Sequence, residues 1–294
     1  MKTLISTWTL LIASVFLIQA QDIKGYAIYK SQVKLDIQLD STQMDDVMRE
    51  QMMAMMKKQF EKEYTLTFNR DESIFKENEK LDSPSGAGGG GMVFVVAGSG
   101  AADALYKNVK ENRFANQNEL FGKEFLIQDT IPESKWEKQK ETKNIGQYTC
   151  FKATYTKNDT IKSSFSRIGR NGQASDSSNV RVVERVVTAW YTPQVPVSHG
   201  PKMFGGLPGL VLEINDGQER ILCSKIVLNP KEGISIKEPS KGKKVSQKEY
   251  DMILQKKLKE QEEQFGQDGR KRQDGNSFSI RIGCLLYTSP SPRD

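Results

Sequence analysis

Apolar and polar residues alternate with a period of two over much of this chain, and this alternation restricts the possible fold more than any other feature. The apolar residues of 33–39 are separated by polar ones, and the same pattern recurs over 64–68 and 278–282. A period of two places the apolar side chains on one face of a strand. The sequence therefore predicts half-buried β-strands.

Turn signals between such runs indicate antiparallel neighbours. Apolar runs at 210–214 and 220–228 flank Asn215-Asp216-Gly217-Gln218, and Asp-Gly between two apolar runs is a strong hairpin signal. A polar loop rich in Gly and Ser is expected at 167–179. Further strand-like runs occupy 106–114, 120–128, 148–156 and 180–191.

Two segments have the three- and four-residue spacing of an amphipathic helix. The first, 42–61, carries a stripe of methionines, and the second begins at a capping box formed by Ser246 and Glu249 and runs to about Gln264. We therefore expect an α+β fold that is mostly β. It is a curved antiparallel sheet or open half-barrel with two amphipathic helices, the methionine-rich one covering the concave face, and a β-sandwich is the alternative.

The two ends of the chain are expected to lie outside the folded domain. Residues 1–20 have the basic start, the apolar run and the small final residue of a secretory signal peptide. The run is too short for a membrane anchor. Residues 284–294 resemble translated sequencing-adapter read-through and are interpreted as a non-native tail. This leaves 21–283 as a single β-rich domain with a flexible Gly-rich insertion at about 82–102, no transmembrane segment, and a location in the periplasm or cell envelope, or outside the cell.

The cysteines fit an exported protein. Outside the tail the chain has two, Cys150 and Cys223, and an even number in an oxidising compartment is typical of a disulfide. We predict a bond between them. The alternative is two buried free thiols.

One segment is unusually rich in proline and glycine. Residues 192–209 contain four of each. Proline fixes the backbone angle φ, and glycine permits positive values of it. The segment is therefore built to follow one irregular path into the strand that begins at Leu210.

This segment also carries a family resemblance. The sequences Trp190-Tyr191-Thr192-Pro193, Gly200-Pro201 and Gly206-Leu207-Pro208-Gly209-Leu210-Val211 resemble the signature of the GLPGLI family, exported proteins of Bacteroidetes, with Val in place of the final Ile. The similarity extends to 148–154 and 221–230 and excludes the Gly-rich insertion. The resemblance implies an exported envelope protein of no assigned activity, some of whose relatives are encoded near outer-membrane TonB-dependent receptors. It supplies no catalytic residues.

Two roles are open for this loop. In the first, leucines anchor the turn in the core while Gly205, Gly206 and Gly209 let the backbone pass closely. In the second, the loop contacts a ligand or partner, because prolines lower the entropy cost of holding a binding conformation. The side chains available for such contact are those of His199, Phe204, Leu207, Pro208 and Leu210.

The sequence contains no catalytic or metal-binding pattern. His199 is the only histidine, no Gly-x-Ser-x-Gly elbow accompanies it, and a single histidine in a loop is usually a surface residue. One histidine and two paired cysteines do not supply three zinc ligands. The methionine stripe of 42–61 would suit Cu(I), although core packing explains it better. We expect no metal and no cofactor.

The charge balance argues against a nucleic-acid partner. The chain has 43 basic and 37 acidic residues, a net charge of +6, and no basic block interleaved with aromatic residues. Two functions remain. The favoured one is a non-enzymatic binding or accessory protein for an apolar ligand or for an envelope protein of a TonB-dependent system. The other is an exported hydrolase with an unrecognised active site.

Overall fold

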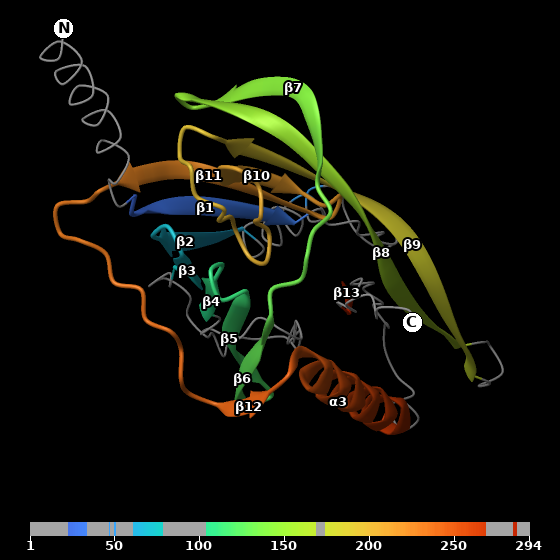
Figure 1. The fold of residues 1–294 in the computed structure, drawn as a ribbon. Helices are drawn as coiled ribbons and strands as arrows, with labels where there is room; N and C mark the ends of the chain where they lie inside the picture. The colour runs from blue at the N-terminus through green and yellow to red at the C-terminus, as the bar shows by residue number, and fades with distance from the viewer. Residues whose placement is uncertain are drawn as a thin grey trace, which may run out of the picture.

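The computed structural model describes residues 23–33, 61–78, 104–168 and 174–268, together with the positions 47, 50, 285 and 286. The strands of these segments belong to one sheet, and a helix lies beside one end of it (Figure 1). The expectation of a mostly β protein is confirmed.

The described residues form thirteen strands and the helix α3. The strands are β1 (Gly25–Val33), β2 (Lys62–Phe68), β3 (Glu72–Glu77), β4 (Ala104–Asn108), β5 (Arg113–Leu120), β6 (Lys123–Thr130), β7 (Glu137–Ile145), β8 (Tyr148–Ile168), β9 (Ala174–Thr192), β10 (Leu210–Asn215), β11 (Glu219–Leu228), β12 (Lys243–Val245) and β13 (Leu285–Leu286). The helix α3 covers Gln247–Asp268.

The strand order is β12-β6-β5-β4-β3-β2-β1-β11-β10-β9-β8-β13, and β7 pairs with β8 outside this path. Every pair is antiparallel except β12 with β6. Within the described residues the first and last strands of the path do not pair, so the sheet is open and continuous, unlike the two sheets of a sandwich. The strand direction turns steadily from β1 to β6 in Figure 1, as the right-handed twist of sheets requires.

The hairpin predicted at 215–218 is confirmed. The strands β10 and β11 pair antiparallel on either side of it, and Gly217 has a φ of 87°. The carboxylate of Asp216 accepts hydrogen bonds from the backbone amides of Gln218 at 3.0 Å and Glu219 at 2.9 Å. This side-chain capping of the turn is why Asp is favoured at such positions.

Two strand predictions are wrong in their extent. The run 106–114 is divided between β4 and β5 by a turn in which Asn112 has a φ of 52°, a conformation that Asn tolerates. The polar loop expected at 167–179 is shorter, because β8 continues to Ile168 and β9 begins at Ala174. The hairpin of β8 and β9 extends beyond the rest of the sheet in Figure 1, and the two strands pair with each other over almost their whole length.

The helix α3 begins at the predicted capping box. The hydroxyl of Ser246 accepts a hydrogen bond from the amide of Glu249 at 3.3 Å, and the Glu249 carboxylate accepts one from the amide of Ser246 at 2.8 Å. No helix within the described residues is long and apolar enough to cross a membrane. The methionine-rich helix expected at 42–61 lies outside the described residues except for positions 47, 50 and 61, so one of the two expected helices is confirmed.

The largest apolar core joins the sheet to the loop that follows β9. Tyr29 of β1 and Phe68 of β2 are fully buried in it, together with Val195 and Val197 of the loop. The Tyr29 hydroxyl donates a hydrogen bond to the carbonyl of Val211 at 2.7 Å, which satisfies the polar end of a buried ring. The loop is therefore part of the core.

Several predicted segments lie outside the described residues. These are the signal peptide at 1–20, the insertion at 82–102 and the strand at 278–282. Of the tail 284–294, Leu285 and Leu286 form β13 and pair with β8.

Candidate functional site

The loop 193–209 between β9 and β10 is held by hydrogen bonds within its own backbone. The amide of Leu210 donates to the carbonyl of Val195 at 2.9 Å, and the amide of Gly206 donates to that of Ser198 at 3.1 Å. These bonds cross the loop at two places. The proline- and glycine-rich segment thus follows the single irregular path that its composition predicts.

A buried lysine on another strand of the sheet fixes this path. Lys107 of β4 is only 2% exposed, and its ammonium group donates to the carbonyls of Gly200 at 3.0 Å, Lys202 at 2.6 Å and Phe204 at 3.2 Å. An ammonium has three donors, so all of them are used. Burial lowers the pKa of Lys107 to about 7, while the three carbonyls favour its charged form.

His199 is buried beside this lysine, so the expectation of a surface histidine is wrong. Its side chain is 0% exposed, and neither ring nitrogen makes a well-formed hydrogen bond. Burial lowers its pKa to about 3, the Lys107 charge adds to that effect, and the nearby backbone of Asn69 and Arg70 opposes it. The imidazole is therefore neutral at physiological pH.

Close approach of backbone to backbone explains two glycines of the turn. Gly209 has a φ of 159°, and a Cβ there would lie 2.3 Å from the carbonyl oxygen of Thr192. A Cβ at Gly205 would lie 2.8 Å from the carbonyl oxygen of Ser198. The carbonyl of Gly205 itself accepts a hydrogen bond from the indole N–H of Trp136 at 2.9 Å. No side chain fits at either position without displacing the backbone.

Gly206 differs from its neighbours. Its φ is 78°, yet a Cβ there would meet nothing within 4 Å. Only the conformation, and not the space, favours glycine at this position.

The side chains proposed to contact a ligand are mostly turned inward. Leu207 and Leu210 are fully buried, as is His199. Phe204 is half-buried, and Pro208 is exposed. This geometry favours the first of the two roles, in which the leucines anchor the turn in the core.

A second charged residue of this region is also buried. Glu213 of β10 is 5% exposed, and its carboxylate accepts hydrogen bonds from Lys143 at 2.5 Å and from Arg220 at 3.0 Å. The Lys143 ammonium also lies 4.2 Å from the centre of the Trp190 ring. The carboxylate is thus neutralised by two partly exposed cations. Neither Lys107 nor Glu213 was singled out from the sequence, where no local signal distinguishes them from surface charges.

The predicted disulfide is not confirmed. Cys150 and Cys223 are buried free thiols, and burial raises their pKa values to about 11 and about 12. Cys150 lies on β8 and Cys223 on β11, with β9 and β10 between them. Both side chains belong to the same apolar core, where the structure leaves them unbonded.

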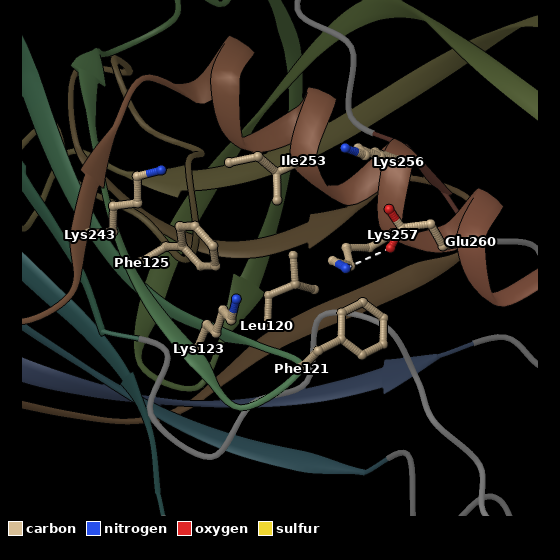
Figure 2. A pocket seen from close by; sticks show the side chains of 9 residues that line it. All are labelled: Leu120, Phe121, Lys123, Phe125, Lys243, Ile253, Lys256, Lys257 and Glu260. Carbon is tan, nitrogen blue, oxygen red and sulfur yellow. Dashed lines mark hydrogen bonds and ion pairs between the residues drawn. The ribbon is translucent and has the colours of Figure 1, made fainter.

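A groove of about 400 Å³ opens at the other end of the sheet, between the β5–β6 hairpin, β12 and α3 (Figure 2). The packing of Tyr250 against Phe125, with ring centres 5.6 Å apart, fixes α3 over β6. Phe121 stands at the hairpin tip and is 40% exposed. The lining residues are Leu120, Phe121, Lys123, Phe125, Lys243, Ile253, Lys256, Lys257 and Glu260.

The described residues bring together no metal-binding cluster. No group of three or more His, Cys, Asp or Glu side chains among them is placed to hold a metal ion. Two titratable groups, Lys107 beside the loop and His199 within it, are closed to solvent. A second hollow of about 260 Å³ lies on the other side of β6, lined by Leu126, Gln128, Glu238, Pro239, Ser240 and Lys244. The groove beside α3 is the larger of the two.

These features define a protein built on an open, mostly antiparallel sheet, with a core loop fixed by a buried lysine. Residues 136–213 match the model of a family described as a protein of unknown function (Porph_ging). The matched segment begins at Trp136, which bonds the loop, and ends at Glu213. It contains β7, β8, β9 and the whole loop.

The solved structures that match this chain include two of PNGF-II, in space groups C2 and P21. They share 13% sequence identity with this chain, with TM-scores of 0.44 and 0.45. The matches cover 80% and 81% of this chain and 33% and 34% of the other, so the chain spans about a third of the length of these proteins. No curated protein matches the sequence.

Proposed function

We propose that this chain is an exported, non-enzymatic binding protein of the cell envelope, of the GLPGLI type, and that it holds an apolar ligand in the groove beside α3. The sequence of the turn at 206–211 and the match of 136–213 to a family of unknown function support the family assignment. The basic start and apolar run of residues 1–20 support export.

The observation that carries the proposal is the composition of the groove. Leu120 and Phe125 form a buried apolar floor, and Phe121 and Ile253 add apolar surface from the hairpin and the helix. Figure 2 shows these side chains facing one another across the groove. Small-molecule sites are concave and mostly apolar, with a few polar groups at their edges, and this groove has that composition.

The loop is less suited to a ligand than the groove is. Its leucines are part of the core, and its exposed side chains are those of Pro193, Gln194, Pro196 and Pro208. The ligand site is therefore proposed at the groove, and the loop is assigned a structural role.

The hydrolase alternative has one observation in its favour. A cluster of Ser, Lys or acidic side chains beside the loop would favour a hydrolase, and Lys107 is one such residue that contacts the loop. Its three donors are taken up by loop carbonyls, and it is 2% exposed. A catalytic group must come within hydrogen-bond reach of its substrate, so binding is favoured over hydrolysis.

Titration with a neutral apolar probe, N-phenyl-1-naphthylamine, tests the proposal. Phe121→Asn removes apolar surface from the groove, and because Phe121 has a φ of 49°, asparagine suits the backbone there. Burying a phenylalanine contributes roughly 1.5–3 kcal/mol, so probe binding should weaken about ten-fold or more. Val186→Asn, at a residue of β9 that is 56% exposed and does not line the groove, is the matched control. Absence of probe binding, or equal binding by both variants and the unchanged protein, would contradict the proposal.

A further inference from the structure

We infer that the groove selects an anionic amphiphile with a single apolar chain, of the fatty-acid carboxylate class. This inference rests on the proposed binding function and concerns the same site. It follows from the charge that surrounds the apolar floor.

The groove is lined by four lysines and one glutamate. Glu260 is paired with Lys257 at 2.6 Å. The other three lysines form no ion pair with any of the residues that the structure describes. The three are Lys123, Lys243 and Lys256. At longer range Lys243 attracts Glu249 and Lys256 attracts Glu260. Four lysines against one glutamate still leave the lining an excess of three positive charges around its apolar surface.

These three lysines come from three separate elements. Lys123 begins β6, Lys243 begins β12, and Lys256 lies in α3. Figure 2 shows them around Phe125 and Ile253, on different sides of the apolar floor. Sequence-distant elements thus converge to give a site with an apolar centre and a cationic edge.

This arrangement matches the two parts of a fatty acid. The alkyl chain gains about 0.8 kcal/mol for each methylene group removed from water, and the carboxylate lies among ammonium groups. Lysine is a compact point charge on a flexible stem, so it pairs with a carboxylate without a fixed geometry. An acidic peptide fits less well, because its backbone amides would face an apolar floor without hydrogen-bond partners.

The size of the groove favours one chain. Small-molecule sites span roughly 300–1,000 Å³, and this groove of about 400 Å³ lies near the lower end. A lipid with two acyl chains needs more apolar room than that.

The test compares dodecanoate with dodecanol, which has the same chain and no charge, as competitors of the neutral probe on the full chain. Dodecanoate should bind roughly ten-fold more tightly, since each of three exposed charge pairs contributes a modest amount. Raising the salt concentration should remove this preference without weakening dodecanol, because salt screens exposed charges.

A triple variant identifies the source of the preference. Lys123→Gln, Lys243→Gln and Lys256→Gln together should lower dodecanoate affinity to that of dodecanol. The matched control makes the same charge change at exposed lysines elsewhere, Lys110→Gln, Lys135→Gln and Lys231→Gln, and should keep the preference.

The outcomes separate this inference from the function on which it rests. If dodecanol and dodecanoate bind equally at low salt, and Phe121→Asn weakens both, the groove binds apolar chains and the inference of anion selectivity is overturned. If neither ligand nor the neutral probe binds, the proposed function itself fails. The salt dependence is measured on the unchanged protein, so it decides the matter even where the triple variant does not fold.

Discussion

Replacing His199 by leucine should reduce the loss of stability that the protein undergoes in mild acid. The side chain is fully buried without a well-formed hydrogen bond, and its pKa is lowered to about 3. The unfolded chain binds a proton at this residue near the usual value of about 6.5. Between these two values the unfolded state holds more protons than the folded state, so the free energy of unfolding falls as the pH falls.

The size of the effect follows from the distance to the unfolded pKa. A pH of about 5 lies roughly 1.5 units below the pKa of the histidine in the unfolded chain. Each pH unit in this range changes the free energy of unfolding by about 1.4 kcal/mol. His199 should therefore cost about 2 kcal/mol of stability between about pH 7.5 and about pH 5. Because it is the only histidine in the chain, no other residue of this type titrates in that window.

Urea unfolding followed by tryptophan fluorescence at these two pH values measures the difference. The protein and the His199→Leu variant both retain Lys107, whose pKa of about 7 contributes equally to both and cancels in the comparison. The variant should lose about 2 kcal/mol less than the protein on acidification. Equal losses would refute the inference that the folded state withholds the proton from His199.

Three further predictions concern the loop and its surroundings. Gly209→Ala should lower the free energy of unfolding by several kcal/mol, because its Cβ would lie 2.3 Å from a backbone oxygen. Gly206→Ala should lower it by only about 1 kcal/mol. Thermal melts that rank the two variants in the opposite order would disprove the packing argument. Cys150 and Cys223 should resist alkylation at mildly basic pH in the native protein and react after denaturation, because burial raises both pKa values. Recovery of a disulfide-linked peptide under non-reducing conditions would contradict the assignment of free thiols. Glu213→Gln should destabilise the protein by about 1–3 kcal/mol in urea unfolding, because it weakens two charge-assisted hydrogen bonds to a buried group, and an unchanged midpoint would mean that these bonds contribute nothing.

Local signals in the sequence were sufficient for the features that depend on adjacent residues. The hairpin at 215–218 and the capping box at 246–249 are made by side chains that bond their own backbone, so their sequence patterns carry the whole mechanism. The extent of β8 and β9 was not predictable in the same way. A two-stranded ribbon bonds through its backbone, and its polar side chains resemble those of a loop.

The sites depended on contacts between distant residues. The Pro- and Gly-rich composition predicted an irregular loop but not which of its side chains face inward, so His199 was placed at the surface. Lys107 is held by carbonyls about 93 residues further along the chain, and nothing near it in the sequence indicates this. The groove likewise combines a hairpin tip near Phe121 with α3, and neither element alone suggests a site.

The position of β1 has a consequence for how the chain folds. This strand lies inside the sheet between β2 and β11, and its first residue, Gly25, pairs with Leu228. The sheet therefore cannot be completed until nearly all of the described chain is available, and closing so long a loop is entropically costly before the contacts form. A topology dominated by such distant pairings folds slowly, in roughly milliseconds to seconds. During that interval β2 and β11 each expose an unpaired edge, which makes the partly folded chain prone to associate with other copies.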